Sequence, residues 1–244
     1  MATILITSGG TKVPIDEVRH IGNMSSGRFG AELARWALKL GHTVIFLYAK
    51  DSQRPDQLTL NLKGNTTENR DAKLMTDIGY LLTDQQYLHA VQTRLFMIEY
   101  RDFNDYAEKL EKWCQKPLVD CILLTAAVSD YGMPATGGKI SSDKDEITFT
   151  LTKNPKLITL VKGWAPKATL VGFKLLVDTT PEAMWEAVKK QMDAAGSDWV
   201  VANDLRSIKE GNHTVHLYLK DCSDPVTFDK DPAFRVIECV TEGK

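Results

Sequence analysis

The chain has 244 residues, of which 43% are hydrophobic and 25% are charged, and its formal net charge is -2. These values are typical of a globular protein with one large domain or two small ones. They exclude a strong attraction of the whole molecule to nucleic acid or to an anionic membrane, so we expect neither as a partner.

Targeting signals and metal motifs are not evident in the sequence. No run of about 18 apolar residues could span a bilayer, and residues 1–7 lead straight into a strand-like run without the basic region of a signal peptide. The four cysteines form no C-x-x-C pair, which is typical of reduced structural thiols. We therefore expect a cytoplasmic protein without a zinc site.

The first 48 residues predict one β-loop-α-β unit. Residues 4–7 form a short apolar run like that of a buried parallel strand, and residues 43–48 form a second one. Between them, residues 30–40 have apolar side chains at helical spacing, and Gly41 follows as a natural stop. The loop from 8 to 30 is unusually long for such a unit.

Helices and strands continue to alternate through the rest of the chain. Residues 51–75 are polar and turn-rich, and they begin an expected insertion that reaches about residue 95. After residue 75 we predict helices at 80–94, 103–114, 155–162 (capped by Asn154) and 181–195, and strands at 95–100, 119–125, 147–151, 169–173 and 199–201. The tail predicts a hairpin with strands near 213–219 and 225–228, then a helix or strand near 233–240.

This alternation predicts a single α/β domain, 1–244, of the Rossmann-like doubly wound type. We expect a mostly parallel sheet with helices on both faces and a small C-terminal β-hairpin extension. Ligands of such sheets bind outside the carboxyl ends of the strands, so the residues that follow each strand are the most informative.

Residues 25–30, Ser-Ser-Gly-Arg-Phe-Gly, open the first predicted helix. Free backbone N–H groups and the positive end of the helix dipole make such a turn an anion site. The alternative is a plain serine N-cap with a surface arginine, and the pattern alone leaves both open.

The long first loop carries Asp16, Arg19, His20 and Asn23. Its glycine pair lies roughly fifteen residues before the Ser-Ser-Gly turn, too far for a dinucleotide-binding G-x-G-x-x-G fingerprint. The polar set either binds a ligand, as loops on a rigid scaffold often do, or holds the loop through an Asp16–Arg19 ion pair.

Two further residues have a functional and a structural interpretation. Asp130 follows a buried strand, where one carboxylate can hold Mg²⁺ beside phosphates or can simply cap a turn. Lys139 follows two glycines, so it can close over a phosphate chain or remain a surface lysine.

Eight stretches carry a family resemblance when they are taken in order: 4–11, 15–19, 22–30, 126–131, 139–140, 153–156, 171–175 and 201–204. They resemble phosphopantothenoylcysteine synthetases (phosphopantothenate–cysteine ligases), in their free-standing form, over almost the whole chain. The resemblance implies a ligase of coenzyme A biosynthesis that joins 4′-phosphopantothenate to cysteine through an acyl-nucleotide, with CTP or ATP, Mg²⁺ and a homodimer.

The resemblance also implies the site residues. Asn23 would contact the acyl-nucleotide and Arg19 the phosphorylated substrate, and with Lys139 they are the catalytic candidates. Asp130 would hold the metal. The nucleotide-binding candidates are Gly10, Ser25, Ser26, Gly27, Phe29, Ala127, Asp130, Phe173, Lys174, Asn203 and Asp204.

Two other functions remain alternatives. An NAD(P)-binding reductase would fit the architecture, but the glycine motif is split and no Tyr-x-x-x-Lys occurs. A non-catalytic nucleotide-binding module would not need Asn23, Asp130 and Lys139 together. The resemblance leaves the choice between CTP and ATP open.

Overall fold

The computed structural model describes residues 1–57, 85–141, 143, 145–211 and 213–242. Most of the predicted insertion, residues 58–84, therefore lies outside the described residues, as does the start of the helix expected at 80–94. Among the described residues, no helix is both long enough and apolar enough to cross a membrane.

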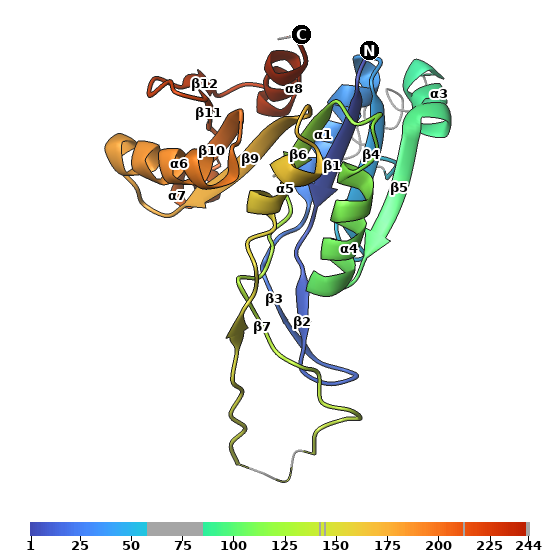
Figure 1. Cartoon of the computed structure of the whole chain (residues 1–244), viewed down its shortest axis with the longest axis vertical. Coiled ribbons are helices and arrows are strands. Elements are labelled where there is room, and N and C mark those ends of the chain that lie inside the picture. The colour runs from blue at the N-terminus through green and yellow to red at the C-terminus, as the bar shows by residue number, and fades with distance from the viewer. Residues whose placement is uncertain (58–84, 142, 144, 212, 243–244) are drawn as a thin grey trace, which may run out of the picture.

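A central sheet confirms the predicted Rossmann-like α/β fold (Figure 1). Within the described part of the chain it has eight strands in the order β12-β11-β10-β9-β6-β1-β4-β5. Neighbours from β10 through β9, β6, β1 and β4 to β5 run parallel, and the β11–β12 hairpin extends the sheet in antiparallel fashion, as expected. The bounds are β1 Thr3–Ser8, β4 Thr43–Ala49, β5 Leu95–Tyr100, β6 Cys121–Leu124, β9 Thr169–Leu176, β10 Trp199–Asp204, β11 Val215–Leu219 and β12 Val226–Phe228.

Helices cover both faces of this sheet. On one face α1 (Arg28–Lys39), α3 (Gln85–Arg94) and α8 (Pro232–Glu242) pack over a core that includes Ile4, Phe46 and Val201. On the other face lie α4 (Phe103–Cys114), α5 (Ile158–Trp164) and α6 (Pro181–Ala195). The short α7 (Leu205–Lys209) follows β10.

Local sequence explains the helices whose bounds match the prediction. The side chain of Asp102 accepts a hydrogen bond from the N–H of Asp105 and so caps α4. The side chain of Thr180 does the same for α6, which starts with Pro181 and ends at Gly196 in the left-handed conformation. These signals lie within the helices' own termini, so they could be recognised from the sequence.

Two small ribbons project from the sheet and form an arm, defined as residues 12–22 together with the described residues of 131–153 (Figure 1). In the first ribbon β2 (Lys12–Pro14) pairs with β3 (His20–Gly22), and in the second β7 (Tyr131–Gly132) pairs with β8 (Thr152–Lys153). The ribbons leave the body after β1 and β6, so they start at the carboxyl ends of neighbouring strands.

Two predictions about the second half were wrong. Residues 147–151 form no strand, because this part of the arm has no neighbouring strand to accept its backbone hydrogen bonds. Helix α5 begins at Ile158 rather than at 155, and Asn154 does not cap it. The Asn154 side chain instead donates to the Ser129 carbonyl oxygen at 3.0 Å, which joins the segment before α5 to the segment after β6.

Candidate active site at the carboxyl ends of the central strands

The sheet reverses its winding at β1, which has β4 on one side and β6 on the other. A reversal of this kind opens a crevice outside the carboxyl ends of the two strands, where doubly wound sheets bind ligands. Here the segments after β1 and β6 are joined by backbone hydrogen bonds, from Ala127 N to Gly9 O at 2.8 Å and from Thr11 N to Ala127 O at 3.2 Å. The two segments that border the crevice are therefore held in a fixed position relative to each other.

Asn23 closes one side of this crevice. Its Nδ2 donates to the Ala127 carbonyl oxygen at 3.1 Å. A Cβ on Gly10 would come within 2.9 Å of the Asn23 carbonyl oxygen, so the close approach of the two segments requires glycine. Three residues predicted separately, Gly10, Asn23 and Ala127, thus meet at one place.

The turn that opens α1 forms the adjacent wall. The N-cap is Gly27, in the left-handed conformation with φ of 71°, and no side chain of the described residues caps the helix at this position. Ser26 Oγ accepts only a long 3.4 Å bond from the N–H of Arg28. The alternative of a serine N-cap is therefore wrong, and the first-turn N–H groups are available to an anion.

A pocket of about 320 Å³ lies between this turn and the first ribbon of the arm. It is lined by Gly10, Thr11, Lys12, His20, Gly22, Asn23, Ser25, Ala49, Asp51 and Ser52. The sequence did not single out Lys12, Asp51 or Ser52. Residues 51 and 52 lie just beyond the end of β4 at Ala49 and could have been found by the strand-end rule. Lys12 and Asp51 form an ion pair that lowers the pKa of the Asp51 carboxyl.

Aromatic side chains lie beyond the turn. Phe29 contacts Phe173 edge to face, with ring centroids 6.1 Å apart, and contacts His213 at 4.7 Å. Burial lowers the pKa of His213 and so favours the neutral form of its ring. Asn203 shares its sheet face with Val201 and the paired Phe173. Its buried Nδ2 has no hydrogen-bond partner among the described residues and can serve a ligand.

Other predicted residues have structural partners in the protein. Asp130 is exposed and forms an ion pair with Lys156. The described residues contain no cluster of three possible metal ligands, but a single carboxylate beside phosphates and water is an ordinary Mg²⁺ environment. Asp204 accepts from the N–H groups of Thr179 (2.9 Å) and Arg206 (2.7 Å), so it holds the start of α7.

Lys174 follows Phe173 along β9, and successive strand residues point to opposite faces of the sheet. The structure therefore does not bring the side chain of Lys174 to the Phe29 contact. Its predicted nucleotide contact stays a prediction, as do those of Asp204 and Asp130.

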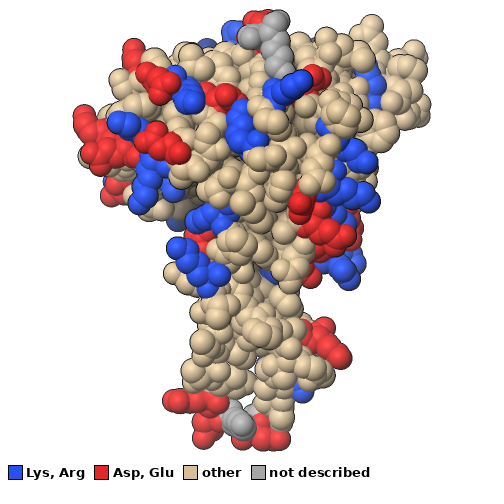
Figure 2. Space-filling view, viewed as in Figure 1, with Lys and Arg blue, Asp and Glu red and all other residues tan. Residues whose placement is uncertain are grey.

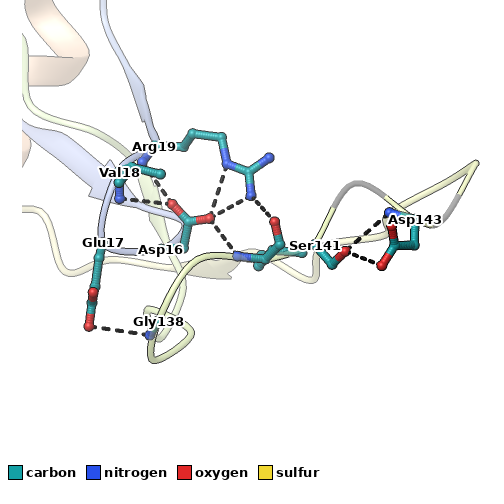
Figure 3. Close-up of polar contacts among 8 residues, drawn as sticks. Asp16, Glu17, Val18, Arg19, Gly138, Ser141 and Asp143 are labelled. Atoms are coloured by element: carbon teal, nitrogen blue, oxygen red, sulfur yellow. Dashed lines mark hydrogen bonds and ion pairs between the residues drawn. The ribbon is translucent and has the colours of Figure 1, made fainter.

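Arg19 and Lys139 lie on the arm and do not line the pocket. Arg19 instead bonds Asp16 and the segment that follows Lys139, as Figure 3 shows. The structural interpretation of the first loop, an Asp16–Arg19 ion pair, is thus present at 2.6 Å. The structure brings Arg19 close to the Lys139 segment, and it leaves both residues outside the pocket that Asn23 lines.

Comparisons with known proteins identify the family of the chain. Residues 1–78 and 92–238 match the family model described as the DNA/pantothenate metabolism flavoprotein C-terminal domain. The phosphopantothenate–cysteine ligases of Mus musculus and Homo sapiens are each 34% identical to the chain. These alignments cover 84% of the chain and 73% and 72% of the mouse and human proteins.

Solved structures share the fold over the full chain. A DNA/pantothenate metabolism flavoprotein from Streptococcus pneumoniae superposes with a TM-score of 0.78 at 24% identity, and the match covers 100% of both chains. A Cab2 mutant in complex with phosphopantothenate-cysteine superposes with a TM-score of 0.76 at 25% identity, over 99% of this chain and 85% of that one.

Proposed function

Because the chain belongs to the family of DNA/pantothenate metabolism flavoprotein C-terminal domains, we propose that it is a ligase of coenzyme A biosynthesis that joins 4′-phosphopantothenate to cysteine. The names of the mouse and human relatives support this activity. The observation that carries the proposal is the uncapped N-terminus of α1, which opens beside Asn23 at the reversal point of the sheet. A helix terminus of this kind stabilises a phosphate chain.

The reaction has two steps, and neither needs a nucleophilic side chain. A carboxylate oxygen of 4′-phosphopantothenate attacks the α-phosphorus of CTP or ATP, and the bond to the β-phosphate oxygen breaks to release pyrophosphate. The cysteine nitrogen then attacks the acyl carbon, the nucleoside monophosphate leaves with the electron pair of the broken bond, and the amine loses a proton. The protein contributes orientation and charge stabilisation.

Different residues of the crevice orient the substrates and stabilise the charge. The N–H groups after Ser25, Ser26 and Gly27 hold the phosphates, and the carboxamide of Asn23 binds the acyl phosphate. Phe29 and Phe173 contact the nucleoside, and the unpaired Nδ2 of Asn203 donates to it. Asp130 would hold Mg²⁺, which when bound neutralises phosphate charge. We expect this chemistry to take place in the cytoplasm.

The arm carries the two remaining cationic residues, Arg19 and Lys139, and it also provides the proposed dimer contact. In this proposal Arg19 binds the phosphate of 4′-phosphopantothenate and Lys139 binds the triphosphate. The arm exposes large apolar side chains, and most of its surface in Figure 2 is neither basic nor acidic. Exposed apolar patches mark protein contacts, so we propose a homodimer that buries Met24 and the arm residues Val18, Ile21, Tyr131, Ile147 and Leu151.

The experiment that tests the function is a pyrophosphate-release assay. Purified protein is mixed with 4′-phosphopantothenate, cysteine and Mg²⁺, with CTP and with ATP in parallel, and each substrate is omitted in turn. Release that requires both the acid and the nucleotide is expected, and the faster nucleotide identifies the base. If neither nucleotide releases pyrophosphate, the ligase proposal is refuted, and a nicotinamide absorbance assay then tests the reductase alternative.

A further inference from the structure

Asp16 is a buried carboxylate in the first ribbon of the arm. Its side chain has no exposed surface, and it accepts five hydrogen bonds (Figure 3). Oδ1 accepts from the backbone N–H groups of Val18 at 3.0 Å and Arg19 at 2.8 Å. Oδ2 accepts from the Arg19 side chain at 3.0 and 2.6 Å and from the N–H of Ile140 at 3.1 Å. One carboxylate therefore bridges two segments that are distant in the sequence.

The segment around Lys139 is attached to the first ribbon on both sides of that lysine. On its carboxyl side, the carbonyl oxygen of Ile140 accepts from Arg19 Nη2 at 2.9 Å, in addition to the bond from its N–H to Asp16. On its amino side, the Gly138 carbonyl oxygen accepts from the N–H of Glu17 at 3.3 Å, and the Gly138 N–H donates to Oε1 of the Glu17 side chain at 3.3 Å. Lys139 is thus not on a freely swinging loop, although two glycines precede it.

The same geometry leaves charged donors of both cations available. The ion pair uses Nε and Nη2 of Arg19, while Nη1 has no hydrogen bond to a described residue. Lys139 is exposed and its Nζ has no partner among the described residues. The Asp16 carboxylate lies against the Arg19 guanidinium and offsets part of the repulsion between two cations on neighbouring segments.

We propose that Asp16 is a positioning residue that holds Arg19 and the Lys139 segment together as one unit, so that the two cations engage the two anionic substrates in concert. This inference rests on the proposed function for its catalytic consequence. The unit itself follows from the hydrogen bonds and can be tested without any activity.

The catalytic test uses Asp16→Asn. An asparagine keeps an oxygen that can accept from the backbone N–H groups of Val18 and Arg19, so the turn at these residues is retained. Its NH₂ group, however, faces the three N–H groups that now donate to Oδ2, so the bonds from the Arg19 side chain and from Ile140 are lost. We expect kcat/KM to fall about tenfold to a hundredfold, as when supporting partners of functional groups are lost. The matched control is Asp198→Asn, because Asp198 also bonds a backbone N–H (Leu170) and a cation (Lys162) but lies at the other end of β10.

Double-variant kinetics separate positioning from a general structural effect. If Asp16 acts through Lys139, adding Asp16→Asn to Lys139→Gln lowers kcat by less than about threefold further. If Asp16 acts through Arg19, Asp16→Asn raises the KM for 4′-phosphopantothenate in the wild-type background. The same substitution then has no effect on this KM in an Arg19→Ala background. The positioning role would be refuted if Asp16→Asn lowered the rate by its full factor in both the Lys139→Gln and the Arg19→Ala backgrounds. It would also be refuted if the control variant Asp198→Asn were as slow as Asp16→Asn.

Amide hydrogen exchange tests the unit independently of catalysis and of any variant that might not fold. In the wild-type protein we expect the N–H groups of Val18, Arg19 and Ile140 to exchange with one common opening free energy. In Asp16→Asn the exchange of Ile140 accelerates, and in Asp198→Asn it does not. Unprotected exchange of Ile140 beside a protected Val18 would refute the unit, whereas absent pyrophosphate release with common protection would refute the ligase proposal alone.

Discussion

Replacement of Gly27 by alanine tests whether the turn that opens α1 is as tightly determined as its geometry indicates. A φ of 71° costs an alanine roughly 1–2 kcal/mol. The added Cβ would also lie 2.7 Å from Ser52 Cβ and 2.9 Å from Ser8 Oγ, and both serines are buried. Overpacking of this kind costs about 1–3 kcal/mol. We therefore expect Gly27→Ala to lower the free energy of unfolding by about 2–5 kcal/mol.

The assay is urea unfolding followed by tryptophan fluorescence, combined with calorimetric titration of CTP and ATP. Because the turn must shift to relieve the contact with Ser52, we also expect nucleotide affinity to fall at least tenfold, or about 1.4 kcal/mol. Gly163→Ala is the matched control, since a Cβ there meets nothing within 4 Å inside α5 and should stabilise by about 0.5–1 kcal/mol. A Gly27→Ala protein with unchanged unfolding and unchanged affinity would refute this account of the turn.

Four further outcomes are expected. Lys139→Gln should lower kcat by about a hundredfold if its ammonium stabilises the transition state, and a near-wild-type rate would return it to a surface role. Asp130→Asn should raise the Mg²⁺ concentration needed for half-maximal rate; an unaltered titration would exclude it as a metal contact. Exposed Cys222 should react first with a thiol reagent, and Cys114, whose pKa burial raises to about 12, should react only on unfolding, as mass mapping of labelled peptides would reveal. Bonding to Arg19 lowers the pKa of Asp16 in the folded protein. The ionised Asp16 therefore contributes its full share to the free energy of unfolding above pH about 3.9, the pKa of an aspartate in the unfolded chain, and this share is lost as pH falls below that value. The urea midpoint should thus drop between pH 5 and pH 3 by more in the wild type than in Asp16→Asn.

The sequence predicted those parts of the fold that depend on local signals. The bounds of α4 and α6 match the prediction because Asp102 and Thr180 cap these helices from within their own first turns. The strand-end rule also identified Gly10 and Ala127, which meet in the crevice beside Asn23, a residue that the sequence placed on the long first loop.

The arm could not be predicted in the same way, because its contacts join segments that are distant along the chain. The N–H of Thr136 bonds the Ile15 carbonyl oxygen, and Ile140 bonds Asp16, across more than a hundred residues of sequence. No local pattern encodes such pairs, and the apolar alternation at 147–151 accordingly predicted a strand that has no partner. The pocket residue Lys12 was missed for the same reason, since its ion pair with Asp51 depends on the placement of the first ribbon beside β4.

The central position of β1 also has a consequence for synthesis on the ribosome. Ile4 pairs with Val44 on one side and with Cys121 on the other, so one edge of β1 stays open until roughly 120 more residues have been made. At about 5–20 residues per second this takes on the order of 6–24 s, during which one edge of an apolar strand has no neighbour. An open, apolar strand edge is a template for pairing with another chain. Nascent copies of this protein should therefore need a chaperone most while residues 50–120 are being added.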